Sequence, residues 1–133
     1  MVNERLKVLI VDDAQLVIIR IIELLQELPS VEKVFGAVSF NQATDCLLNN
    51  TPDLVLMDIQ LPEKNGIELL VYVKKHYPMV KTIMLTNKAG FYYKTICEKE
   101  GCDHFIDKSK EFEKIPTIIE TYAGEKYYTM IKS

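Results

Sequence analysis

Five short apolar segments alternate with five helical patterns along the chain, and this alternation limits the folds open to it. The segment at residues 53–57 is mostly apolar, a pattern that suits a strand buried on both faces of a parallel sheet,. Strands are predicted at residues 6–11, 33–38, 53–57, 81–85 and 103–106, and helices at 14–28, 40–48, 66–76, 90–100 and 112–122. Regular strand–helix alternation predicts an α/β fold with a parallel sheet.

The third predicted strand leads directly into a carboxylate, Asp58. Pro62, Asn65 and Gly66 then interrupt the chain before a helical pattern begins at Ile67,. In open α/β sheets, ligands bind at the carboxyl ends of the strands. Taken alone, Asp58 is equally well explained as a helix-capping or solvated loop residue.

Polar residues also follow the other strands. Asp12 and Asp13 follow the first strand, Thr86 the fourth and Lys108 the fifth. Right-handed crossovers place all these strand ends on one edge of the sheet, where they meet Asp58. Three carboxylates so close together repel one another unless a cation joins them.

Oxygen ligands with open coordination positions suit Mg²⁺, which favours sites that it shares with phosphate. Lys108 supplies a positive charge for a phosphoryl group, and Thr86 supplies a hydrogen-bond donor. With Asp12 and Asp13 assigned to the metal, Asp58 is the best candidate for a nucleophile. The predicted chemistry is therefore phosphoryl handling beside a metal ion.

Together these segments resemble the receiver domain of bacterial two-component response regulators. The matching pieces are LIVDD, DLVLMDIQLPEKNG, TIMLTNKAG and HFIDKS, in the order and spacing of the family, over about residues 5–122. The resemblance implies a flavodoxin-like (βα)5 fold, a doubly wound parallel sheet with strand order 2-1-3-4-5.

The resemblance also implies a role for each polar residue. Asp58 matches the phosphoacceptor, which takes a phosphoryl group from a histidine kinase or a histidine phosphotransfer protein. Asp12 and Asp13 match acids of the Mg²⁺ site, which also uses Asp58 and the backbone carbonyl of Gln60.

Three residues match the family's response to phosphorylation. Thr86 matches the hydroxyl that moves toward the phosphoryl group, and Lys108 the lysine that pairs with it. Phe105 matches the aromatic switch residue that turns inward and changes a face that binds a downstream protein.

The sequence departs from the family's pattern at a few positions. Ser109 follows Lys108 where the family often has a cis proline, which removes the usual reason for a cis bond,. Asn87 stands where a small residue is common, and Gln60 and Lys88 occupy positions that tune phosphoryl lifetime in the family.

We expect a receiver over residues 1–123, followed by a short tail over 124–133 without an effector domain. One alternative is a degenerate receiver that acts only as a binding module. Another is a phosphatase with an aspartyl nucleophile, although such enzymes usually have a second Asp where this chain has Gln60. A flavodoxin would need a hydroxyl- and glycine-rich loop where Asp12 and Asp13 stand.

Composition narrows the expected partners and compartment. The formal net charge is −3 and no run of five Lys or Arg occurs, so direct nucleic-acid binding is not expected,. The chain shows no signal-peptide pattern, and its most apolar helix is shorter than the roughly 20 residues of a membrane span. Three cysteines without metal-type spacing suggest reduced thiols in a cytoplasmic protein,.

Two surfaces are candidates for protein contacts. The first predicted helix carries one apolar stripe for the sheet and a second stripe that either packs on the fifth helix, docks a phosphodonor or forms a homodimer. The second stripe is Leu16, Ile18, Ile19 and Ile22. The other surface, expected to serve output or dimerisation, carries Tyr92, Tyr93, His104 and Tyr122.

Overall fold

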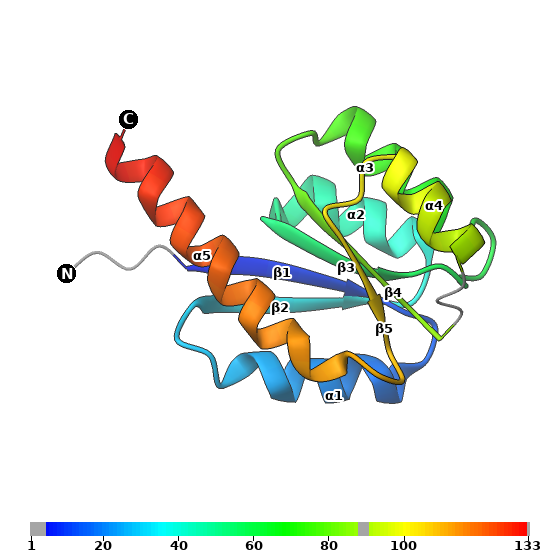
Figure 1. Ribbon diagram of the computed structural model, residues 1–133, viewed down its shortest axis with the longest axis horizontal. Coiled ribbons are helices and arrows are strands. Elements are labelled where there is room, and N and C mark those ends of the chain that lie inside the picture. Colours follow the sequence, from blue (N-terminus) through cyan, green and yellow to red (C-terminus); the bar gives the residue numbers. More distant parts are fainter. Residues whose placement is uncertain (1–4, 88–90, 133) are drawn as a thin grey trace.

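Five parallel strands form one sheet in the order β2-β1-β3-β4-β5, in a computed structural model that describes residues 5–87 and 91–132 (Figure 1). This order confirms the fold implied by the resemblance. The strands are β1 (Leu6–Val11), β2 (Val31–Ala37), β3 (Leu54–Asp58), β4 (Lys81–Thr86) and β5 (His104–Asp107).

Helices cover both faces of the sheet. They are α1 (Gln15–Gln26), α2 (Phe40–Asn50), α3 (Gly66–His76), α4 (Phe91–Lys99) and α5 (Ile115–Lys132), with a short 3₁₀ turn, η1 (Phe112–Lys114), before α5. α1 and α5 pack on one face, and α2, α3 and α4 pack on the other. Successive residues of a strand point to opposite faces of the sheet and pack into the two cores alternately. Ile10 faces α1 and α5, while Leu9 faces α2 to α4.

Local signals fix several helix ends. The Ser39 hydroxyl accepts a hydrogen bond from the backbone of Gln42 at 3.2 Å, as its capping-box spacing predicts,. Asn65 caps α3 through a 2.9 Å bond from the backbone of Glu68,. Gly101 follows α4 with a φ of +91°, a left-handed conformation that favours glycine,.

The expected end of the fifth helix is wrong. α5 does not stop at Tyr122 with a tail from Gly124, but continues to Lys132, and its last turns project beyond the sheet (Figure 1). One glycine inside a helix costs only about 1 kcal/mol, which does not end a helix held by contacts further on. Smaller shifts occur elsewhere: α1 ends at Gln26, β2 begins at Val31 and Asp58 lies within β3. The predicted helix start at Gly90 lies outside the described residues.

The second apolar stripe of α1 is only partly exposed. Ile18, expected on it, is 7% exposed because its side chain packs against Gly36 of β2, and Ile22 packs on the core. Leu16 is 80% exposed and Ile19 50% exposed. The exposed stripe is therefore reduced to these two residues.

The expected aromatic surface also needs correction. Tyr122 is buried beneath His104, with the ring centroids 5.6 Å apart, because it occupies the inner side of α5. Tyr92 is exposed and Tyr93 is half-buried against the core. Among the helices of the described residues, none combines the length and apolar character needed to span a bilayer.

Candidate functional site

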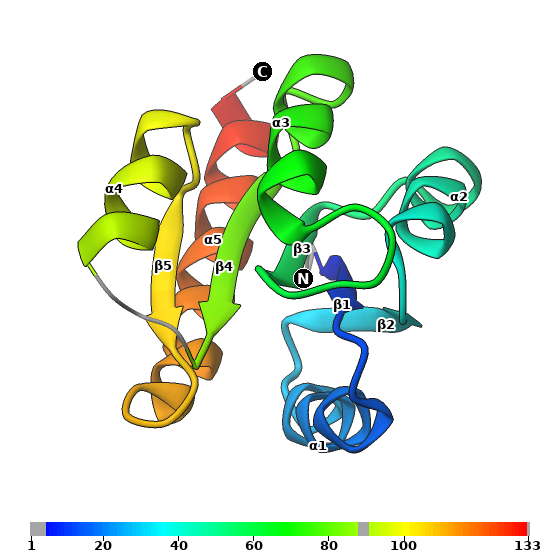
Figure 2. The ribbon, with the colours of Figure 1, turned by 90° about the vertical axis from the view of Figure 1, so that its right-hand side faces the viewer.

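Three aspartates meet at the edge of the sheet where β1 and β3 end. This edge faces the viewer in Figure 2. Asp12 and Asp13 directly follow β1, and Asp58 is the last residue of β3. The two strands are neighbours, with Val11 opposite Met57, so their ends lie together. One carboxylate oxygen from each aspartate lies within 4.8 Å of the others. The structure thus brings together the three acids that the sequence predicted.

Lys108 reaches the same cluster from the end of β5. Its ammonium forms ion pairs with both Asp12 and Asp58, the latter at 2.8 Å. Its backbone N–H donates to the carbonyl of Thr86 at 3.0 Å, which ties the end of β5 to the end of β4. One cation therefore stands against the carboxylates of two strands.

Both oxygens of Asp58 have donors. Oδ2 accepts from Lys108, and Oδ1 accepts from the backbone N–H of Gln60 at 3.2 Å. Burial raises the pKa of Asp58 above its usual range, although Lys108 and the Gln60 N–H oppose this,. Burial alone would lower the pKa of Lys108, but hydrogen bonds from its ammonium to Asp12 and Asp58 outweigh it and raise that pKa. Lys108 therefore stays charged.

The loop after Asp58 folds back onto the aspartate through Gly66, which the sequence marked only as the end of a loop and the start of a helix. The Gly66 N–H donates to the carbonyl of Ile59 at 2.7 Å. A Cβ at this position would lie 1.9 Å from the backbone carbonyl oxygen of Asp58, so only glycine allows the approach,. Gly66 thus positions the backbone of Asp58.

Asp107 is a second residue that sequence reasoning missed. Its Oδ1 accepts hydrogen bonds from the backbone N–H of Ser109 at 2.8 Å and from its hydroxyl at 2.6 Å. These two bonds lower the pKa of Asp107. The turn that follows Lys108 is built this way with Ser109 in place of proline, and an Asp two residues before a Ser is the signal that reveals it.

Thr86 and Phe105 lie on the adjacent strands β4 and β5. Thr86 is buried at the end of β4, in register with Asp107. Phe105 lies opposite Met84, half-buried against the layer of α2 to α4, and does not join the carboxylate cluster. Gln60 contributes its N–H to Asp58, while its role as a carbonyl ligand stays a prediction. Lys88 lies outside the described residues.

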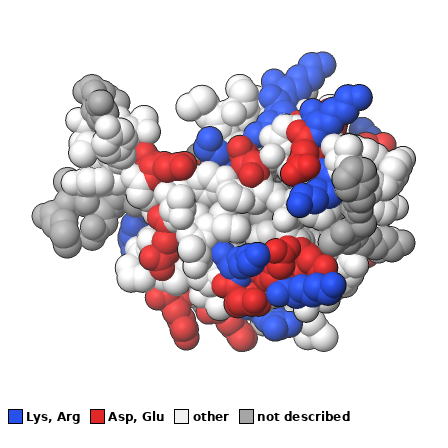
Figure 3. Space-filling model, in the orientation of Figure 1, with Lys and Arg blue, Asp and Glu red and all other residues white. Residues whose placement is uncertain are grey.

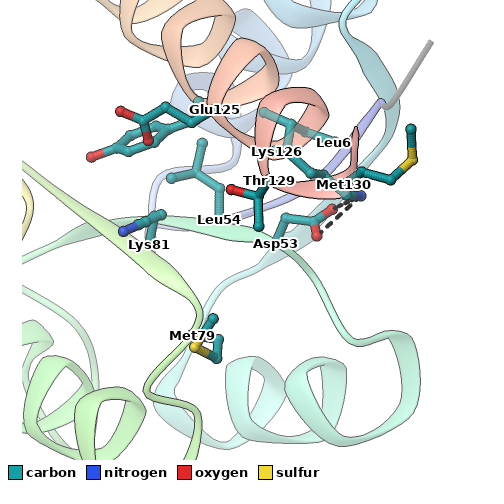
Figure 4. A pocket seen from close by; sticks show the side chains of 10 residues that line it. Leu6, Asp53, Leu54, Met79, Lys81, Glu125, Lys126, Thr129 and Met130 are labelled. Carbon is teal, nitrogen blue, oxygen red and sulfur yellow. Dashed lines mark hydrogen bonds and ion pairs between the residues drawn. The ribbon is translucent and has the colours of Figure 1, made fainter. Parts of the chain in front are cut away.

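The carboxylate cluster suits a hard divalent cation, because its three acids supply only oxygen ligands,. A cleft of about 460 Å³ lies at the opposite end of the sheet, beneath the last turns of α5 (Figure 4). Leu54, Met79 and Met130 line it, and none of the five polar site residues does.

Comparison with known proteins agrees with this geometry. Residues 8–120 match the family described as "Response regulator receiver domain". The chain therefore belongs to the response regulator receiver family, as the sequence motifs implied.

Two curated relatives differ in length. The chain is 31% identical over 126 residues to "Response regulator protein VraR" of Staphylococcus epidermidis, covering 92% of this chain but 59% of that protein. It is 34% identical over 119 residues to "Protein CcdB" of Bacillus subtilis, covering 89% of this chain and 98% of that protein. The chain therefore spans little more than half the length of the VraR relative, but nearly all of CcdB.

A solved structure supports the same fold. The signal receiver domain of an HD domain-containing protein from Pseudomonas fluorescens superposes with a TM-score of 0.82 at 25% identity. The match covers 94% of this chain and 98% of that chain.

Proposed function

We propose that this receiver accepts a phosphoryl group on Asp58 from a histidine kinase or a histidine phosphotransfer protein. The observation that carries the proposal is the grouping of Asp12, Asp13 and Asp58 around the Lys108 ammonium. A carboxylate oxygen of Asp58 attacks the phosphorus of the donor's phosphohistidine. The new P–O bond forms as the P–N bond breaks, and the donor's imidazole nitrogen keeps the bonding electron pair.

Asp12, Asp13, Asp58 and the backbone carbonyl of Gln60 would hold Mg²⁺. When bound, the ion neutralises negative charge on the phosphoryl oxygens. Lys108 already pairs with Asp58, so its ammonium lies close enough to form an ion pair with a phosphoryl group on that aspartate. The chain in this way catalyses its own phosphorylation. In dephosphorylation a water oxygen attacks the phosphorus, the P–O bond to Asp58 breaks, and the carboxylate and inorganic phosphate are released.

Phosphorylation of Asp58 would change the conformation of the ends of β4 and β5. The phosphoryl group attracts the Lys108 ammonium and the Thr86 hydroxyl, and the carbonyl of Thr86 already accepts from the Lys108 backbone. Movement there reaches Phe105, which lies beside Met84 on the same strand pair. The changed face of α4 and β5 would then bind a downstream protein.

Output through protein contacts fits the charge distribution. On the face that Figure 3 shows, Lys and Arg lie interspersed with Asp and Glu rather than gathered in one basic patch. Nucleic-acid recognition relies on such a patch. The cysteines are free thiols, which fits the reducing cytoplasm,.

Labelling with a small phosphodonor tests the function. With acetyl phosphate and Mg²⁺, intact-mass measurement should show one added phosphoryl group on the wild type and none on Asp58→Asn. Asp53→Asn, which changes an aspartate at the other end of the sheet, should label like the wild type. A wild type that stays unlabelled would favour the binding-module alternative, and equal labelling of Asp58→Asn would reject the assigned acceptor.

The exposed residues of α1 are the proposed docking contact for the protein donor. Leu16 and Ile19 project from the helix that begins two residues after Asp13. Large apolar side chains exposed together often mark protein contacts. The double variant Leu16→Asp, Ile19→Asp should accept the phosphoryl group from a histidine phosphotransfer protein about 10-fold or more slowly than the wild type. Acetyl phosphate should label the double variant and the wild type at the same rate.

A matched control places the same change elsewhere. Leu48→Asp alters another exposed leucine, on α2, and should leave both rates unchanged. If labelling by the two donors falls together in the α1 variant, the stripe supports the site itself and the docking assignment is wrong.

A further inference from the structure

The loop that follows Asp58, residues 59–65, is held at both ends. Near its start the Gln60 N–H donates to the Asp58 carboxylate at 3.2 Å, and at its end the Gly66 N–H donates to the Ile59 carbonyl at 2.7 Å. Each residue has only two soft backbone dihedrals. A change at one residue between these fixed ends must therefore be compensated at its neighbours in the loop.

Glu63, inside this loop, has a left-handed backbone conformation with a φ of +68°. Such a φ is uncommon for residues other than glycine, and glutamate lacks the short side chain with which asparagine or aspartate stabilises it locally. Glu63 is also exposed, so burial does not hold it. A contact of its side chain is needed to keep the backbone in this conformation.

The Glu63 side chain makes such a contact with α2. Its Oε2 accepts a hydrogen bond from the Asn41 amide at 3.0 Å. The next residue, Lys64, places its ammonium 4.8 Å from the centre of the Phe40 ring,. Both partners lie in the first turn of α2, the helix toward which the loop bends in Figure 2. Two consecutive loop residues thus contact the same helical turn.

The first turn of α2 is a firm support for the loop. Phe40 is buried, and its ring packs edge-to-face on Tyr72 of α3 with the centroids 5.6 Å apart. The Ser39 cap fixes the start of the helix. Asn41 therefore offers its amide from a position that the core sets.

We propose that the hydrogen bond between Asn41 and Glu63 is a positioning contact for the carboxylate site. By holding Glu63 in its left-handed conformation, the bond fixes the path of the loop and with it the orientation of the Gln60 peptide groups beside Asp58. The inference rests on the proposed function, in which the Gln60 carbonyl is a ligand of Mg²⁺. Asn41 and Glu63 act through Gln60 and hold no metal themselves.

The affinity for Mg²⁺ measures this role. Asn41→Ala removes the donor and keeps the charge of Glu63. Titration of the full chain with Mg²⁺, followed by amide chemical shifts around Asp13, should give a dissociation constant about 5-fold above the wild-type value, as loss of one exposed hydrogen bond implies. Asn49→Ala, which changes an exposed asparagine near the other end of α2, should bind as the wild type does. Equal affinity of Asn41→Ala and the wild type would overturn the proposal.

Two substitutions of Glu63 separate positioning from charge and from stability. Glu63→Gln loses the charge but keeps an oxygen acceptor for Asn41, so it should bind Mg²⁺ as the wild type does. Glu63→Gly loses the acceptor but adopts a positive φ without strain. Its Mg²⁺ binding should weaken about 5-fold, while its urea midpoint stays at or above the wild-type value. If Mg²⁺ affinity and stability fall together in Glu63→Gly, or if Glu63→Gln binds as weakly, the positioning role is rejected.

A double substitution tests whether the two side chains act as one contact. The double variant Asn41→Ala, Glu63→Gly should bind Mg²⁺ no more weakly than the weaker of the two single variants, because each change already breaks the same bond. Losses that add would mean that the two residues act separately, contrary to the proposal.

Hydrogen exchange without metal keeps this inference separate from the proposed function. In EDTA, exchange of the Gln60 N–H reports its hydrogen bond to Asp58. Asn41→Ala should speed this exchange about 5-fold, although the substitution lies on another element, and Asn49→Ala should not. A wild type whose Mg²⁺ response survives in Asp13→Asn would contradict the proposed metal site. Unchanged Gln60 exchange in Asn41→Ala would reject the positioning contact, whether or not Mg²⁺ binds.

Discussion

The two ends of the sheet hold aspartates in opposite chemical settings. At the carboxyl ends of the strands, Asp12 and Asp58 crowd against one ammonium, that of Lys108. At the amino ends, Asp53 and Asp103 each have a backbone N–H and a lysine of their own. The same residue type thus forms a cluster around one shared cation at one end and separate structural contacts at the other.

The amino-end contacts are specific. Asp53 accepts from the backbone N–H of Lys7 at 2.8 Å. Asp103 accepts from the backbone N–H of Thr82 at 2.8 Å, from the Thr82 hydroxyl at 3.2 Å and from Lys74 at 3.0 Å. Each carboxylate joins the starts of two neighbouring elements.

The backbone explains the difference. Parallel strands all begin at one edge and leave N–H groups there, whereas the opposite edge presents carbonyl oxygens. A carboxylate at the amino edge therefore finds donors on the next strand. At the carboxyl edge, Asp58 and Asp12 accept instead from N–H groups of the loops that follow them, those of Gln60 and Ala14. The two acids also share the Lys108 ammonium, so a common cation joins the two strand ends.

Removing the cation of the carboxyl edge should have the largest effect on stability. Lys108→Met leaves Asp12 and Asp58 without their ammonium, and breaking a buried ion pair costs about 3 kcal/mol. Urea unfolding in EDTA should show this loss, and Mg²⁺ should recover much of it because a divalent ion replaces the ammonium. Lys110→Met, at an exposed neighbouring position, is the control. Wild-type stability of Lys108→Met in EDTA would contradict the contrast between the two edges.

Asp103→Ala should cost less, about 2 kcal/mol at pH 7, because it removes an acceptor shared by Thr82 and Lys74. Burial would raise the pKa of Asp103, but the Thr82 N–H and Lys74 outweigh it and hold that pKa below its usual range. The stabilisation is therefore complete above the unfolded pKa of about 4, and it disappears as the pH falls through the folded value.

Unfolding measured from pH 7 down to acid checks this sign. The wild type and Asp103→Ala should converge as the solution becomes more acidic, while Asp45→Ala, which changes an exposed aspartate on α2, should match the wild type throughout. A difference that grows toward low pH would show that the carboxylate is not held in its ionised form.

The smallest effect is expected for Lys126→Met. Its ion pair with Asp53 is partly exposed, and the methionine keeps most of the apolar stem, so the loss should be about 0.5 kcal/mol,. Hydrogen exchange is the sharper measurement, since the last turns of α5 should exchange faster while β3 stays protected. Equal exchange in the two proteins would mean that Lys126 does not anchor the helix.

The sequence patterns predicted those features of the fold and the site that follow from the order of strands and helices along the chain. Strand–helix alternation predicts that Asp12, Asp58 and Lys108 reach one edge, whatever the details of the loops. The buried side of α1 could not be predicted in this way, because Ile18 and Ile19 are equally apolar. Gly36, on another strand, decides between them: a Cβ there would lie 2.8 Å from a methyl group of Ile18.

The end of α5 could not be predicted either, because it too depends on a contact with a residue distant in the sequence. Gly124 looks like a helix terminator, but a contact between Lys126 and Arg5, residues 121 positions apart, helps to hold the helix beyond it. Tyr122 was placed on the surface because its burial depends on where α5 crosses the sheet, which sequence periodicity does not specify. In each case the deciding partner is distant in the sequence.

Gly66 has a consequence for protein engineering. The carbonyl oxygen of Asp58 would lie 1.9 Å from any Cβ at this position, so the backbones of the aspartate and of the first residue of α3 are in close contact. A designer who moves Asp58, the proposed acceptor, into another scaffold must transplant the strand end, the loop and the glycine together at their present length. An inserted residue in the loop would separate Gly66 from the carbonyl of Asp58 and release the aspartate from its place.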